Sequence, residues 1–276
     1  MTMNSIMNAF FLKSLRPYFN FPGLSLPTAL NSGLWLDEKI EAMQHSIPME
    51  VTDYLERYPL TKHIDVYLND INGIMRGKRL SVESMLTLEK GCYFPLSVYS
   101  MGQKGKISAP LHDEPDRLCV PVAGSLCPSA QDPQHNAQIL LTMKDSNGQP
   151  CPFEPRVILQ NVLARFHQHG LFPVIAPEIE FYLTGRETRD PQNQGCFHMD
   201  TSTAHAALFD ELEQLAQLQR IPLTGIVAEA EPGQFELNLK HSHRVVEVCD
   251  NVLALRRLTR HVAEQHGLQA SFMAKP

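Results

Sequence analysis

The chain has 276 residues, 43% hydrophobic and 20% charged, a balance typical of a globular protein rather than a disordered or fibrous one. Its formal net charge of −6 gives no electrostatic reason to expect nucleic acid or an anionic membrane surface as a partner. Six cysteines without a C-x-x-C pair indicate reduced thiols rather than a zinc site or a disulfide framework, so we expect a cytoplasmic protein.

Residues 1–47 are expected to form an irregular N-terminal extension. Its apolar stretch, FFLKSLRPYFNFPGLSLP, is interrupted by charged residues and prolines. It is therefore a poor match to a signal peptide, and it contains no apolar run long enough for a membrane helix. The first ordered element is predicted to be a helix over Pro48–Arg57, because proline is tolerated in the first helical turn.

Residues 48–150 indicate a small domain that is mostly β after its first helix. The strand-like run IDVYLND is followed by Asn72-Gly73 and then by IMRGKRL, which predicts a β-hairpin. Beyond the hairpin, short apolar runs alternate with clusters of Pro, Gly, Asp and Asn, and no long helical period is present.

From residue 151 onward the pattern changes to alternating helices and strands. Helices are predicted over 154–169, 203–220 and 244–266, each followed by Gly or Pro near its end. The last helix carries an apolar stripe at helical spacing, which indicates core packing. The chain stops after ASFMAKP, a strand-like run with no closing element, so we expect the second domain to continue beyond Pro276.

Two strand-like segments carry acidic residues in a pattern that points to chemistry. In PEIEFYL, Glu178 and Glu180 alternate with apolar residues, so a strand would direct both carboxylates to one face. In VAEAEPGQFELNLK, Glu236 alternates with apolar residues in the same way. Glu229 precedes a Pro-Gly interruption that can direct it toward the same cluster.

Carboxylates gathered in this way repel one another unless they hold protons or a cation. Ligation by oxygen alone favours magnesium or manganese over zinc or copper. The alternative is that both segments are amphipathic edge strands whose acids are only solvated.

The motifs NDINGIMRGKRL, PEIEFYL, EAEPGQFELNL and ASFMAKP, in this order and spacing, resemble the glutamine synthetase family over about residues 48–276. The runs LEKGCYFPLSVYSM and EPDRLCVPVAGSLCPSA are more similar to its polyamine-directed branch, the γ-glutamylpolyamine synthetases. The resemblance implies an α+β fold. A β-grasp N-terminal domain over 48–150 would precede, over 151–276, the first part of a catalytic domain of antiparallel strands with flanking helices. It also implies homo-oligomers whose active sites lie between subunits.

The resemblance also implies roles for individual residues. Glu180, Glu229 and Glu236 would hold a first Mg²⁺ or Mn²⁺ ion beside the amino-acid substrate, and Glu178 would contribute to a second ion at the phosphates of ATP. His241 would lie near the nucleotide base, although a satisfied surface or core histidine is the simpler interpretation. No catalytic residue is assigned. The implied reaction is ATP-dependent ligation of the glutamate γ-carboxylate to an amine through a γ-glutamyl phosphate, in polyamine catabolism.

The choice of amine depends on Pro95, which stands where ammonia-using members of the family have an aspartate. Proline can act neither as a base nor as a cation ligand, so putrescine is the expected amine. Two alternatives stay open: a glutamine synthetase that uses ammonia, and a short non-catalytic homologue that binds metal. The family's later histidine loop and arginines are not in this sequence, so the 276-residue chain is expected to be an incomplete and inactive ligase.

Overall fold

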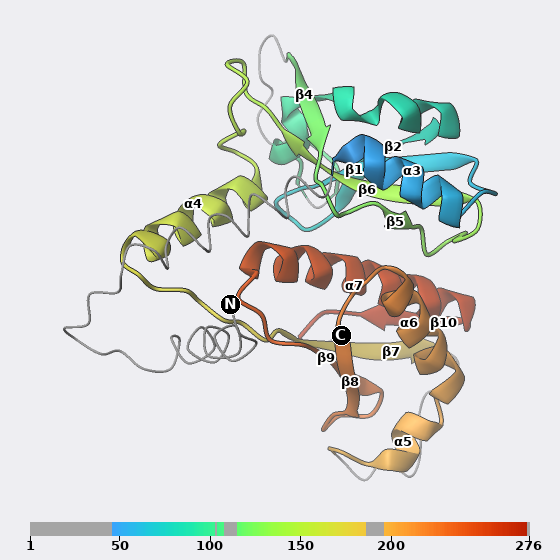
Figure 1. Cartoon of the computed structure of the whole chain (residues 1–276). Helices are drawn as coiled ribbons and strands as arrows, with labels where there is room; N and C mark the ends of the chain where they lie inside the picture. Colours follow the sequence, from blue (N-terminus) through green and yellow to red (C-terminus); the bar gives the residue numbers. More distant parts are fainter. Residues whose placement is uncertain (1–45, 103, 108–114, 186–195, 275–276) are drawn as a thin grey trace, which may run out of the picture.

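A computed structural model of the chain describes residues 46–102, 104–107, 115–185 and 196–274 (Figure 1). Most of the predicted N-terminal extension lies outside the described residues. The helices are α3 (Ile47–Arg57), α4 (Pro155–Gln168), α5 (Met199–Thr203), α6 (Ala206–Leu218) and α7 (Val245–Gln265), with the 3₁₀ segments η1 (Val82–Lys90) and η2 (Leu96–Ser100). The strands are β1 (His63–Asn69), β2 (Met75–Ser81), β3 (Cys92–Pro95), β4 (Asp116–Pro121), β5 (Cys127–Pro128), β6 (Asn136–Met143), β7 (Glu178–Gly185), β8 (Leu223–Ala228), β9 (Gln234–Leu239) and β10 (Leu268–Ser271).

The first sheet has the strand order β2-β1-β6-β4-β3, and β5 pairs with β6 outside this path. β1 is antiparallel to β2 and parallel to β6, and the remaining pairs are antiparallel. The predicted hairpin is confirmed. In its turn, the Asp70 carboxylate accepts hydrogen bonds from the backbone N–H groups of Asn72 at 2.8 Å and Ile74 at 2.9 Å, and Gly73 has a φ of 69°.

Strand β1 has one buried and one half-buried face, with different surroundings. Ile64, Val66 and Leu68 are fully buried and pack in the first core with α3 and η1. Period-two alternation turns Tyr67 and Asn69 to the opposite side, where they line a cavity together with residues of α7. The first sheet is therefore covered on both sides, which accounts for the almost continuous burial of its central strand β6.

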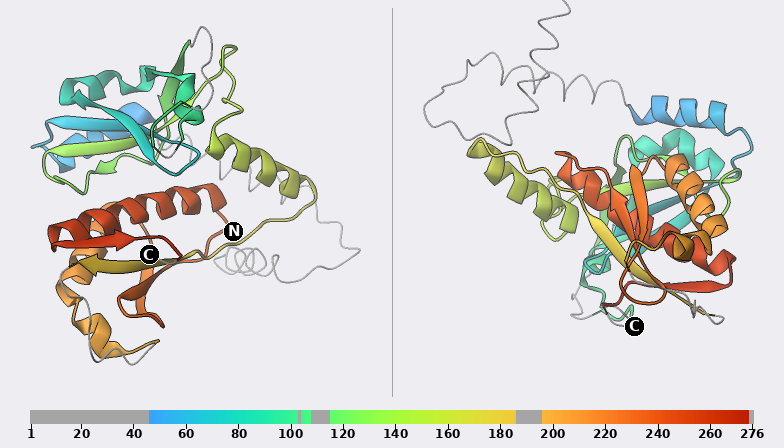
Figure 2. Two further views of the ribbon diagram at one scale, coloured as in Figure 1. Left: turned by 180° about the vertical axis from the view of Figure 1, so that it is seen from behind. Right: turned by 90° about the horizontal axis from the view of Figure 1, so that it is seen from below.

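The second sheet has the order β10-β7-β9-β8, and every neighbouring pair is antiparallel. Its buried side chains pack against α6 and α7 around Phe181 and Phe235, whose ring centroids lie 6.0 Å apart. In Figures 1 and 2, α7 lies between the two sheets. Of the residues in its predicted apolar stripe, Val245, Val248, Leu255 and Leu258 are buried.

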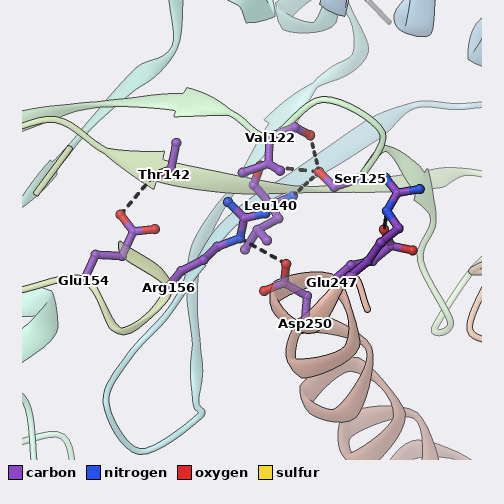
Figure 3. Close-up of polar contacts among 9 residues, drawn as sticks. Val122, Ser125, Leu140, Thr142, Glu154, Arg156, Glu247 and Asp250 are labelled. Carbon is purple, nitrogen blue, oxygen red and sulfur yellow. Dashed lines mark hydrogen bonds and ion pairs between the residues drawn. The ribbon is translucent and has the colours of Figure 1, made fainter. Parts of the chain in front are cut away.

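Polar contacts join the two sheets and their helices. Arg156, at the start of α4, forms an ion pair with Asp250 of α7 at 3.0 Å (Figure 3). Farther along α7, Arg257 donates to Gln138 of β6 at 3.0 Å. In a third contact, the Arg220 guanidinium donates to the backbone oxygen of Leu126 at 2.6 Å. Because these groups are paired, the interface is specified by directional bonds as well as by packing.

The predicted helices over 48–57, 154–169 and 244–266 are confirmed to within one residue at each end by α3, α4 and α7. The predicted helix over 203–220 corresponds to α6, and the separate short helix α5 precedes it. All six cysteines are free. No helix in the described part of the chain is both long and apolar enough to cross a membrane.

Candidate metal site on the second sheet

Three of the four predicted metal ligands lie on one face of the second sheet. In β7, Glu178 and Glu180 are exposed and alternate with buried side chains, and in β9 the half-buried Glu236 does the same. Glu180 and Glu236 are direct cross-strand partners, while Glu178 faces Asn238. Side chains at directly opposed positions lie about 5 Å apart at Cβ, where two like charges destabilise a sheet.

The fourth glutamate is brought to the same end of the sheet by a turn. Glu229 follows the last residue of β8, and its backbone N–H donates to the oxygen of Gln234 at 2.9 Å. In this turn Gly233 has a φ of 78°, and a Cβ there would lie 2.8 Å from the backbone oxygen of Leu183. The close approach to β7 therefore requires glycine, which explains the Pro-Gly interruption noted in the sequence.

The four carboxylates form one electrostatic group. Burial raises the pKa of the Glu236 carboxyl above its ordinary value, against the lowering effect of a hydrogen bond with Asn238. The negative charges of Glu178, Glu229 and Glu180 raise the pKa of Glu236 further. A carboxyl flanked by three others is less readily ionised, and a divalent cation would remove that repulsion.

Gln234 is the polar group that connects β9 to both neighbouring segments. Its side-chain N–H donates to Glu180 Oε2 at 2.7 Å, and its Oε1 accepts from the backbone N–H of Glu231 at 3.2 Å. The side chain of Gln234 thus contacts one of the four glutamates directly.

The four candidate ligands are all carboxylates, a donor set that suits Mg²⁺ or Mn²⁺. Within the described residues, no three His, Cys, Asp or Glu side chains converge closely enough to hold a metal ion. Glu178 and Glu180 are two positions apart on one strand, a separation of about 7 Å. These carboxylates fit the donor set of such an ion, but they would have to rotate toward one another to ligate it.

The other candidate residues have different surroundings. His241 is exposed just beyond β9, beside a bridge between Ser242 and Ile175. Pro95 is the last residue of β3 and precedes η2.

Asn72 and Arg76 of the β1–β2 hairpin each contact a neighbouring polar group, and so does Cys196. Asn72 donates to the backbone oxygen of Met101 at 2.8 Å, and Arg76 forms an ion pair with the buried Asp70 at 3.0 Å, which indicates structural roles for both. The exposed Cys196, which no sequence pattern singled out, places its sulfur 3.8 Å from Glu229 Oε2.

Comparison with known proteins identifies the fold and the sequence pattern. Residues 152–276 match the family model described as the glutamine synthetase catalytic domain. The chain is also 46% identical over 263 residues to γ-glutamylputrescine synthetase of Escherichia coli, covering 88% of this chain and 56% of the relative. Residues 152–276 belong to the glutamine synthetase catalytic-domain family. The resemblance predicted from the motifs is thus confirmed.

Another relative and two solved structures extend this comparison. A glutamate–isopropylamine ligase from a Pseudomonas species is 24% identical over 83% of this chain and 53% of its own length. A solved structure described as ligand-free GmaS has a TM-score of 0.67 at 22% identity, over 80% of this chain and 52% of its own. The glutamine synthetase of Plasmodium falciparum also has a TM-score of 0.67, at 15% identity over 84% of this chain and 51% of its own. The chain thus spans about half the length of these relatives, and the structural likeness concerns the fold alone.

Proposed function

We propose that the chain forms part of an ATP-dependent ligase that joins the γ-carboxylate of glutamate to an amine, with putrescine as the preferred amine. The observation that carries this proposal is the single sheet face shared by Glu178, Glu180 and Glu236, with Glu229 at its end. The 46% identity to a γ-glutamylputrescine synthetase supports the choice of amine. Pro95 supports it as well, because proline offers no base or cation ligand for ammonium.

In this proposal Glu180, Glu229 and Glu236 hold one divalent cation beside glutamate, and Glu178 contributes to a second at the phosphates of ATP. Bound Mg²⁺ or Mn²⁺ would supply charge neutralisation for phosphoryl transfer. The four carboxylates supply the negative charge that retains the ions, and the rigid sheet fixes their spacing. His241, exposed just after β9, is proposed to lie near the nucleotide base.

The proposed reaction has two steps. The γ-phosphoryl group passes from ATP to the γ-carboxylate of glutamate, which gives ADP and γ-glutamyl phosphate. The amine nitrogen then attacks the acyl carbon, phosphate leaves, and the nitrogen loses a proton to give the amide. The protein contributes positioning and electrostatic stabilisation in such a transfer rather than covalent chemistry.

The domain organisation belongs to the same proposal. A β-grasp domain over 48–150 and a catalytic part over 151–276 are supported by two separate buried cores, which group residues 51–151 and 179–263. An irregular extension over 1–47, homo-oligomers with shared active sites, and a cytoplasmic location complete the proposal. The six free cysteines are consistent with that location.

Two measurements test the proposal. Titration with Mn²⁺, followed by the electron paramagnetic resonance signal of the free ion, should show binding to the chain that weakens at least tenfold in Glu236→Gln. Release of phosphate from ATP by a full-length form of the ligase, in the presence of glutamate and Mg²⁺, should depend on putrescine. Faster release with ammonium would favour the ammonia-using alternative. Metal binding without phosphate release by that full-length form with either amine would favour the non-catalytic homologue. Absence of Mn²⁺ binding would contradict the metal site itself.

A further inference from the structure

The side chain of Gln234 has both ends of its amide engaged, on two different segments. Its Nε2 donates to Glu180 Oε2 on β7 at 2.7 Å, and its Oε1 accepts from the backbone N–H of Glu231 in the turn at 3.2 Å. The orientation of the amide follows from these partners, because an ionised carboxylate only accepts and a backbone N–H only donates.

These two hydrogen bonds restrict two of the four glutamates, Glu180 and Glu229, in two ways. With Oε2 of Glu180 held by Gln234, Oε1 is the oxygen that could bind a cation once the neighbouring carboxylates rotate toward it. The same amide joins β7 to the turn that follows Glu229, so the positions of the two carboxylates are coupled. Orienting a glutamate before binding reduces the conformational entropy that ligation would otherwise remove.

The chemical nature of the donor also matters. A lysine or arginine at this position would neutralise Glu180 and compete with a cation for its charge, whereas a neutral amide orients the carboxylate and leaves its charge unchanged. We infer that Gln234 is a positioning residue that presents Glu180 Oε1 to a divalent cation and fixes Glu180 relative to the turn that carries Glu229. This inference rests on the proposed function, because it presupposes the metal site.

The test uses the 276-residue chain and Mn²⁺ as the probe. In Gln234→Met the side chain keeps its length but loses both hydrogen bonds, and we expect the dissociation constant for Mn²⁺ to rise about tenfold or more, the usual effect of removing a partner that orients a metal ligand. The matched control is Gln269→Met, at an exposed glutamine on the edge strand β10 of the same sheet. Its dissociation constant should equal that of the unmodified chain.

A second comparison separates positioning from a general structural effect. In a Glu180→Gln background, Gln234→Met should have little further effect on Mn²⁺ binding, because the carboxylate through which it acts has been removed. An equal loss in both backgrounds would overturn the inference in favour of a structural role. Mn²⁺ binding that Gln234→Met leaves unchanged would also overturn it, while leaving the proposed metal site intact.

Absence of Mn²⁺ binding by the unmodified chain would overturn the metal site and this inference together. Thermal unfolding without metal checks that each variant is folded. If Gln234→Met does not fold, Gln234→Asn serves in its place, since its shorter amide cannot span from Glu231 to Glu180. Weakened Mn²⁺ binding by Gln234→Asn would support the inference, and unchanged binding would overturn it.

Discussion

The hydrogen bonds of Glu154 can be tested directly by mutation. This residue immediately precedes α4 and is only 3% exposed. Its Oε2 accepts a hydrogen bond from Thr142 Oγ1 at 3.0 Å (Figure 3). The same oxygen accepts a second hydrogen bond from the backbone N–H of Met143 at 2.8 Å. Glu154→Ala removes the acceptor and leaves a buried N–H and a hydroxyl without their partner. Each unsatisfied group costs about 1–3 kcal/mol, so the free energy of unfolding should fall by about 3 kcal/mol.

Glu154→Gln is the matched control, because its amide oxygen can accept the same two hydrogen bonds. We expect this variant to retain most of the stability at pH 7, and we expect Glu154→Ala to unfold roughly 6–12 °C lower, given about 2–4 °C per kcal/mol for a chain near this size. Urea unfolding followed by circular dichroism measures the difference. Equal destabilisation of the two variants would refute the assignment of the stability to these hydrogen bonds.

The pH dependence gives an independent check on Glu154. Burial raises the pKa of its carboxyl, against the lowering effects of its hydrogen bonds. The stabilising contribution of Glu154 is therefore fully present below the pKa of the unfolded chain, about 4.3, and is lost as the pH rises through the higher pKa of the folded state. The unmodified chain should lose stability relative to Glu154→Gln as the pH rises above about 4.3. A difference that does not change with pH would contradict the assigned direction.

Three further predictions concern other parts of the fold. Arg156→Met should lower the free energy of unfolding in urea by about 2 kcal/mol at pH 7, because it leaves the carboxylate of Asp250 without its partner, and by less at pH 4, where Asp250 can be protonated. Gly91→Ala should lower the free energy of unfolding by at least about 2 kcal/mol, since Gly91 has a φ of 72° and its Cβ would lie 2.2 Å from a backbone oxygen. Gly148→Ala should lower it by about 1 kcal/mol, because Gly148 has a positive φ but open space around it. Iodoacetamide should modify the exposed Cys196 before the five buried or half-buried cysteines, as measured by peptide mass spectrometry, and faster modification of any other cysteine would contradict the structure.

The local part of the candidate site could be predicted from the sequence because strand alternation is a local property. The spacing of Glu178, Glu180 and Glu236 among buried apolar residues was sufficient to place each on the polar face of its strand. The pairing of Glu180 with Glu236 could not be predicted, because the register of β7 and β9 is set by packing between segments far apart in the chain. The contact between Gln234 and Glu180 depends on that register, so it could not be predicted from the sequence either.

Helix prediction shows the same division between local and long-range information. Both ends of α3 and α4 and the C-terminal end of α7 are indicated by nearby proline or glycine, so these limits were predictable within one residue. The separation of α5 from α6 has no such signal, and the continuous apolar pattern of residues 203–220 did not reveal it. The position of Cys196 beside Glu229 likewise results from the path of the chain past the end of β8 rather than from any motif.

The parallel pairing of β1 with β6 limits the order in which the N-terminal half can fold during synthesis. The β1–β2 hairpin closes locally, but the other edge of β1 stays unpaired until residues from Asn136 onward have been made, because His63 pairs with Asn136. Closing so long a segment removes chain entropy before the contacts compensate for it, which makes this step slow. Until then the nascent chain exposes an apolar strand edge that is prone to wrong pairing, whereas β8 and β9 need only a short turn to meet.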